Sequence, residues 1–215
     1  MTSPISILLV DDHQIVCNAV RAYFETLRDF AVVGEAASGE DVVMLVSELV
    51  PDIVLLELIK PDMDGIETIR RLKQISPRTQ VVVLTSSYED AYILPATQAG
   101  VVSYNLKNMK MEWLADEVRG AYHGEFRLHP HVAALMLQII CDKKGGEQTY
   151  FIELTDRELD VLKLIENGLT NTQVAEKLIV SETVVKNHIS NILSKLYLAG
   201  RISEAVKPRL DRPRA

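Results

Sequence analysis

The sequence predicts two domains: an α/β domain built on a doubly wound, five-stranded parallel sheet, and a small all-α domain after it. Three observations support this expectation. Apolar β-branched runs alternate with amphipathic stretches over the first 122 residues, and this alternation stops after residue 124. The net charge also changes along the chain, from −8 over residues 1–128 to +1 over residues 129–215.

Five apolar runs in the first 104 residues predict the strands of the sheet. They lie at residues 5–10, 31–36, 53–57, 80–84 and 101–104. Runs such as IVLL and VVVL are apolar on both sides, which is typical of strands that helices cover on each face. The amphipathic stretches after the runs predict helices near 14–27, 39–49, 64–75, 89–99 and 109–122.

A proline interrupts the fourth of these helices. An interior proline removes a helical hydrogen bond and costs about 3 kcal/mol, unless it lies in the first turn. We therefore expect this helix to begin near Leu94 and residues 86–93 to form a loop. The alternative is an ordinary helix that is kinked at Pro95.

After residue 124 the pattern is helical throughout. Thr155 begins a capping box with Glu158, and Ser181 is also a good N-cap. The expected helices are Pro130–Cys141, Thr155–Asn167, Thr172–Leu178, Ser181 to about Leu198, and a last short one over Ser203–Val206 that Pro208 ends. The domain boundaries are then 1–124 for the α/β domain, 125–152 for a helix and the linker DKKGGEQT, and 153–215 for the all-α domain with a basic tail.

The composition is that of an ordinary globular protein, with 47% hydrophobic and 25% charged residues. The longest uncharged apolar stretch, His131–Cys141, is well short of the roughly 20 residues that span a bilayer, and no signal peptide is evident. Cys17 and Cys141 lack the spacing of a disulfide framework or metal site, which favours structural thiols in a reducing compartment. We expect a soluble, cytoplasmic protein without a membrane partner.

Polar side chains follow four of the predicted strands. Parallel strands end at one edge of a sheet, so we expect these side chains to converge. Clustered carboxylates repel one another unless a cation offsets them, and Mg²⁺ prefers oxygen ligands. The sequence therefore predicts an acidic pocket suited to Mg²⁺, formed by Asp11, Asp12, Glu57, Thr85 and Lys107.

Four motifs in this region, LLVDDH (8–13), LLELIKPDMDGIE (55–67), VVVLTSS (81–87) and SYNLK (103–107), occur in a characteristic order and spacing. With them, residues 4–122 resemble the receiver domain of a two-component response regulator. The resemblance implies a flavodoxin-like fold in which Thr85 and Lys107 bind the incoming phosphoryl group and Tyr104 is the rotating aromatic of the output face. It implies a metal site formed by Asp11, Asp12, Glu57 and the backbone carbonyl of Ile59.

The phosphoacceptor aspartate of this family falls at position 57, where the chain has glutamate. The extra methylene moves the carboxylate outward by roughly 1.3–1.5 Å, and a misplacement of about 1 Å already costs around 100-fold in rate. Glu57 is therefore expected to be a poor acceptor, which argues against a sensor histidine kinase as a partner. Two interpretations remain open: Glu57 disables phosphorylation, or its charge partly mimics the phosphorylated state.

Residues 153–206 resemble the LuxR-type helix-turn-helix of the NarL/FixJ class of regulators. Its long helix has one apolar stripe and an opposite face with hydrogen-bonding groups, a central lysine and no acid, which suits the major groove of DNA. Residues 177–215 add a net charge of +5. The expected DNA-binding residues are Gln173, Thr183, Lys186, Asn187, Ser190, Asn191 and Lys195.

These observations together predict a DNA-binding transcriptional regulator with a degenerate receiver, which is not an enzyme. A homodimer on double-stranded DNA is expected, because a single helix-turn-helix has little affinity and half-sites are usually paired. One alternative is a Mg²⁺-dependent phosphoryl-transfer enzyme, although the chain has no Gly-rich phosphate loop. Another is a protein-interaction adaptor that no longer binds DNA, which Lys186 and the basic tail argue against.

Overall fold

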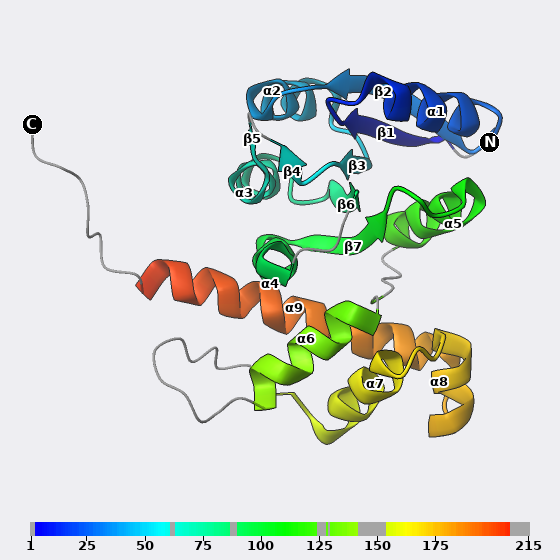
Figure 1. Cartoon of the computed structure of the whole chain (residues 1–215), viewed down its shortest axis with the longest axis vertical. Coiled ribbons are helices and arrows are strands. Elements are labelled where there is room, and N and C mark those ends of the chain that lie inside the picture. The colour runs from blue at the N-terminus through cyan, green and yellow to red at the C-terminus, as the bar shows by residue number, and fades with distance from the viewer. Residues whose placement is uncertain are drawn as a thin grey trace, which may run out of the picture.

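A computed structural model of the protein describes residues 3–60, 63–86, 90–123, 128, 130–141 and 154–206. Its N-terminal domain is the predicted five-stranded parallel sheet (Figure 1). The strands are β1 (Ile5–Val10), β2 (Phe30–Ala36), β3 (Ile53–Leu56), β6 (Gln80–Thr85) and β7 (Val101–Leu106). They lie in the order β2-β1-β3-β6-β7, and a two-residue antiparallel pair, β4 (Ile59–Lys60) and β5 (Met63–Asp64), follows β3.

Helices cover both faces of this sheet, as the doubly apolar strands require. One face packs against α1 (Gln14–Glu25) and α5 (Met111–Tyr122), whose Phe24 and Val118 are fully buried. The other face packs against α2 (Gly39–Leu49), α3 (Gly65–Ile75) and α4 (Asp90–Ala99). Because β1 leads to β2 on one side and its other neighbour is β3, the carboxyl ends of β1 and β3 meet at the topological switch point, where such sheets bind ligands.

Helix α4 runs without interruption from Asp90 to Ala99, so the predicted start near Leu94 was wrong. Pro95 is the sixth residue of α4, and its missing amide leaves one carbonyl, that of Ala91, without its helical donor. Two features offset this loss: Ile93 and Ala96 are almost completely buried, and the Thr97 hydroxyl donates to the Ile93 carbonyl at 2.8 Å. Tertiary packing therefore outweighs the local cost of the proline.

The C-terminal helices are α6 (Pro130–Cys141), α7 (Asp156–Glu166), α8 (Asn171–Leu178) and α9 (Glu182–Val206). The predicted capping box at Thr155 is present, and a second one joins Thr170 to Gln173. A separate last helix over Ser203–Val206 was wrong, because α9 is continuous to Val206. Gly200 is the sole helix breaker in the stretch between, and it costs only about 1 kcal/mol in a helix.

The two domains share one hydrophobic core. Buried Ile93 of α4, Met136 of α6 and Ile189 of α9 belong to a single cluster that continues into the sheet. Figure 1 shows the later half of α9, coloured orange to red, passing beneath α4, with α6 crossing beside it. Among the described residues, no helix is both long and apolar enough to cross a membrane.

Pro95→Ala should raise the free energy of unfolding by about 1–2 kcal/mol, since it restores one helical hydrogen bond and removes the ring clash at some cost in unfolded-state rigidity. Chemical denaturation measures the change. Pro130→Ala is the matched control, because Pro130 is the first residue of α6, where proline is well tolerated. An equal gain in both variants would contradict this account of α4.

Candidate acidic pocket and nucleic-acid interface

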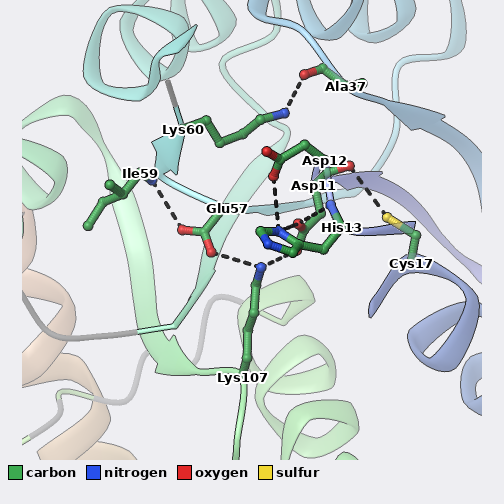
Figure 2. Close-up of polar contacts among 9 residues, drawn as sticks. All are labelled: Asp11, Asp12, His13, Cys17, Ala37, Glu57, Ile59, Lys60 and Lys107. Atoms are coloured by element: carbon green, nitrogen blue, oxygen red, sulfur yellow. Dashed lines mark hydrogen bonds and ion pairs between the residues drawn. The ribbon is translucent and has the colours of Figure 1, made fainter. Parts of the chain in front are cut away.

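The carboxyl ends of the central strands bring the predicted pocket residues together. Asp11 follows β1 directly, and Glu57 follows β3, where its amide donates to the Val10 carbonyl at 2.7 Å. Lys107 follows β7, and its amide donates to the Thr85 carbonyl at 2.7 Å. These backbone bonds fix three side chains on one edge of the sheet, where Figure 2 shows them pointing toward one another.

The ammonium group of Lys107 lies between two buried carboxylates. Its Nζ is 2.5 Å from Asp11 Oδ2 and 2.9 Å from Glu57 Oε2, and the three side chains are 12%, 8% and 4% exposed. Burial by itself would lower the pKa of Lys107, but its hydrogen bonds to Asp11 and Glu57 outweigh that effect and raise the pKa. Lys107 is therefore charged and offsets part of the repulsion between the carboxylates.

The second oxygen of Glu57 is also bonded. Its Oε1 accepts from the Ile59 amide at 3.1 Å, so both oxygens have partners within the protein. The Ile59 amide makes this contact, and a metal contact by the Ile59 carbonyl stays a prediction. Of the remaining predicted residues, Thr85 is buried at the end of β6, and Tyr104 is buried within the shared core.

Asp12 lies at the open side of the pocket, and its side chain is 42% exposed. Its Oδ1 lies 3.1 Å from His13 Nδ1, and the same ring nitrogen is 3.2 Å from Asp11 Oδ1. Burial by itself would raise the pKa of Asp12, but a backbone hydrogen bond and the charges of Lys60 and His13 together outweigh it and lower the pKa. Asp12 therefore remains a carboxylate well into the acidic range.

Two residues of this pocket were missed by the sequence analysis. His13 precedes α1, and its amide donates to Asp11 Oδ1 at 2.9 Å. Lys60, in β4, is 8% exposed and donates to the Ala37 carbonyl. A histidine directly after the Asp11–Asp12 pair was visible in the sequence, but the inward path of Lys60 depends on the loop after β3.

The donor set of the pocket fits a hard divalent cation. One ligand atom each from Asp11, Asp12 and His13 lie within 4.8 Å of one another. Asp11 and Asp12 would hold the ion, since carboxylate oxygen is the ligand that Mg²⁺ prefers. Bound Mg²⁺ would supply positive charge to neutralise a phosphoryl group at this edge.

The predicted DNA-binding face is the outer surface of the first half of α9. Val185, Ile189, Ile192 and Leu193 are buried against the rest of the domain, whereas Thr183, Asn187, Asn191 and Ser194 are exposed. Ser190 is half-buried, and so is Lys186, whose Nζ is 3.3 Å from Glu182 Oε1 one turn earlier. Val184 is 37% exposed and lies beside this polar face.

Two of the predicted DNA-binding residues also hold the domain together. Lys195 makes a 2.7 Å ion pair with Glu158, which is 4% exposed and accepts from the Thr155 amide. Gln173 uses its carbonyl oxygen in the cap of α8, accepting from the Thr170 amide at 2.9 Å. The Gln173 side chain is exposed at the start of α8.

Both halves of the chain match described protein families. Residues 7–119 match the response regulator receiver domain, and residues 153–207 match the bacterial regulatory proteins of the luxR family. The chain therefore belongs to the response regulators that join a receiver domain to a LuxR-type DNA-binding domain.

Individual relatives agree with this family. The chain is 38% identical over 200 residues to the uncharacterized transcriptional regulatory protein YhcZ of Bacillus subtilis, covering 93% of each chain. It is 39% identical over 203 residues to the transcriptional regulatory protein LiaR of the same organism, covering 94% of this chain and 95% of LiaR. The solved structure of the response regulator ChrA from a heme-sensing two-component system has 30% identity and a TM-score of 0.53, covering 95% of this chain and all of ChrA. A LuxR-family response regulator from Aurantimonas sp. has 31% identity and a TM-score of 0.58, covering 63% of this chain and 97% of that chain.

Lys107→Met should destabilise the protein by about 3 kcal/mol, because it leaves two carboxylates buried without their cation. The raised pKa means that this stabilisation is complete below the ordinary lysine pKa of 10.5 and is lost as the pH rises through the higher folded-state value. Denaturant unfolding between pH 7 and pH 11 measures both effects.

The double variant Lys107→Met with Glu57→Gln is the control for this prediction. It removes one of the two negative charges, so it should be less destabilised than Lys107→Met alone. If the loss in free energy of unfolding for the double variant equalled the sum of the losses for the two single variants, the ion pair would not be what stabilises this edge.

Proposed function

We propose that this response regulator is a DNA-binding transcriptional regulator whose receiver acts without phosphorylation at position 57. The observation that supports this most is the state of Glu57: its carboxylate is buried, and both of its oxygens are bonded, one of them to Lys107. Glu57, at the position expected to accept a phosphoryl group, is already paired with Lys107, the residue expected to bind that group. The named relatives are transcriptional regulators, which agrees with a role other than catalysis.

The misplacement of the Glu57 carboxylate supports the same proposal. One additional methylene displaces the carboxylate by roughly 1.3–1.5 Å, and a misplacement of about 1 Å already costs an in-line attack around 100-fold in rate. No sensor histidine kinase is then required as a phosphoryl donor. Without a phosphoryl group, Mg²⁺ bound at Asp11 and Asp12 would offset the negative charge of these two carboxylates.

Partial mimicry of the phosphorylated state is the second candidate, and a specific contact favours it. The 2.9 Å bond from Lys107 to Glu57 is of the kind that the lysine would make to a phosphoryl oxygen. A carboxylate carries about −1 and two oxygens, against −1.5 to −2 and three oxygens for a phosphate, so the mimicry would be partial.

For the DNA-binding domain, we propose that the exposed face of α9 enters the major groove. Thr183, Asn187 and Asn191 would approach base edges, and Lys186 would contact a phosphate. Ser190 borders this face, and Gln173 at the start of α8 would add a phosphate contact. Lys195 has a lesser part in DNA binding because Glu158 neutralises it. A homodimer would place two such helices on paired half-sites.

Control of DNA binding would run through α4. This helix follows the segment after Thr85 at the pocket edge and packs against both α6 and α9. A change at the pocket that shifts α4 would change how the DNA-binding domain is held, since all three helices share one core.

Lys186→Ala should weaken binding to a cognate DNA fragment at least about tenfold and reduce the salt dependence of the affinity by about one counterion, because one phosphate contact is lost. Fluorescence anisotropy at several salt concentrations measures both. Lys163→Ala is the control, since Lys163 lies in the last turn of α7, away from the proposed face. Unchanged affinity and slope for Lys186→Ala would contradict the assignment of α9.

Intact mass after treatment with a small-molecule phosphoryl donor and Mg²⁺ should show no phosphate on the natural sequence and one phosphate on Glu57→Asp, because the shorter side chain returns the carboxylate to its attacking position. Robust phosphorylation at Glu57 would overturn the proposal.

The same variant, left unphosphorylated, separates the two candidates. If Glu57 only disables phosphorylation, Glu57→Asp should dimerise and bind DNA as the natural sequence does. If Glu57 mimics the phosphorylated state, Glu57→Asp should lose dimerisation or DNA affinity. Sedimentation velocity and DNA titration distinguish these outcomes.

A further inference from the structure

We propose that Lys60 is a resident cation of the acidic pocket that weakens the binding of Mg²⁺ by Asp11 and Asp12. This inference rests on the Mg²⁺ site of the proposed function and extends it, because it assigns the strength of that site to a lysine outside the predicted pocket.

The structure holds Lys60 firmly at this position. Its backbone belongs to β4, which pairs with Met63 of β5, and its side chain is only 8% exposed. The ammonium group donates to the carbonyl of Ala37, which directly follows β2. Figure 2 shows Lys60 on the Asp12 side of the pocket and Lys107 on the opposite side, with the carboxylates between them.

The charges of the pocket change when Lys60 is included. Asp11, Asp12 and Glu57 together carry about −3, and Lys107 with one Mg²⁺ would balance that charge alone. With Lys60 as a second fixed cation, the same Mg²⁺ brings the group to about +1. Repulsion between a buried ammonium and a divalent cation is stronger than in bulk water, because the surrounding dielectric is lower.

Oxygens of Asp11 and Glu57 already have partners within the protein. Asp11 accepts from the His13 amide, Glu57 accepts from the Ile59 amide, and both carboxylates form ion pairs with Lys107. Asp12 is therefore the carboxylate with most capacity for an added cation, and it is the one on the Lys60 side of the pocket in Figure 2, where the charge of Lys60 acts on it. The positive charge of Lys60 therefore repels Mg²⁺ at Asp12, the carboxylate best able to bind it.

A purely structural role for Lys60 makes a different prediction. In that case the lysine only ties the loop after β3 to the end of β2, and removing it changes stability but not Mg²⁺ affinity. A variant that keeps the charge separates the two roles, because it preserves the repulsion while changing the shape.

Isothermal titration of Mg²⁺ into the full chain tests the proposal. Lys60→Met should bind Mg²⁺ about tenfold more tightly than the natural sequence, a change of about 1.4 kcal/mol. Lys60→Arg should keep the weak affinity, because it keeps the charge. Adding Asp12→Asn to Lys60→Met should reverse the gain, which locates the ion.

Lys73→Met is the matched control. Lys73 of α3 also donates to a backbone carbonyl, that of Thr79 at 2.8 Å, but Thr79 directly precedes β6 and so lies at the opposite edge of the sheet from the pocket. Its substitution should leave Mg²⁺ affinity unchanged. Circular dichroism checks folding, and Lys60→Gln replaces Lys60→Met if that variant does not fold.

Equal Mg²⁺ affinities for the natural sequence and Lys60→Met would overturn the proposal, and so would an absence of binding by both or an equal gain in Lys73→Met. DNA titration of the natural chain, run in parallel, reports on the proposed function alone. If the chain did not bind DNA, the proposed function would be contradicted, but the Mg²⁺ comparison would still test the role of Lys60. Equal Mg²⁺ affinities would, in turn, leave the DNA result unaffected.

Discussion

The ammonium group of Lys107, held between Asp11 and Glu57, is the interaction on which the functional end of the receiver depends. A parallel sheet brings the ends of its strands to one edge, so carboxylates that follow β1 and β3 are forced together. Lys107 follows β7, which is separated from β3 by β6, and its positive charge offsets the repulsion between the two carboxylates. The same contact engages Glu57, the side chain at the position expected to accept a phosphoryl group, so the ion pair that stabilises this edge is also the basis of the proposed function.

Packing and the satisfaction of polar groups also explain the proline in α4, the start of α7 and the glycine at the start of α3. Proline is tolerated within α4 because the helix is buried between the sheet and the C-terminal helices, where apolar contacts outweigh one lost hydrogen bond. In the DNA-binding domain, Glu158 completes a capping box and neutralises Lys195 at once, which fixes the start of α7 against α9. Gly65 starts α3 for a similar reason, because a Cβ there would come within 2.4 Å of the Leu58 carbonyl oxygen.

Most of the fold could be predicted because its strands are continuous apolar runs and its helices carry local caps such as Thr155. The pocket residues Asp11, Asp12, Glu57 and Lys107 could be predicted because parallel topology alone brings strand ends together. Local rules failed at Pro95 and at the end of α9, where contacts between distant segments or the absence of a strong breaker decide the outcome. Lys60 could not be placed because its direction depends on a short loop whose path the sequence pattern does not specify.

The unbroken α9 has a mechanical consequence. At about 1.5 Å per residue its 25 residues form a rod roughly 37 Å long, with the proposed DNA face near one end and α4 above the later half (Figure 1). Because α9 is one continuous helix, a tilt at one end would be transmitted to the other. A tilt of about 10° where α4 rests on it would displace the far end by roughly 5 Å, which is more than the spacing of adjacent base pairs.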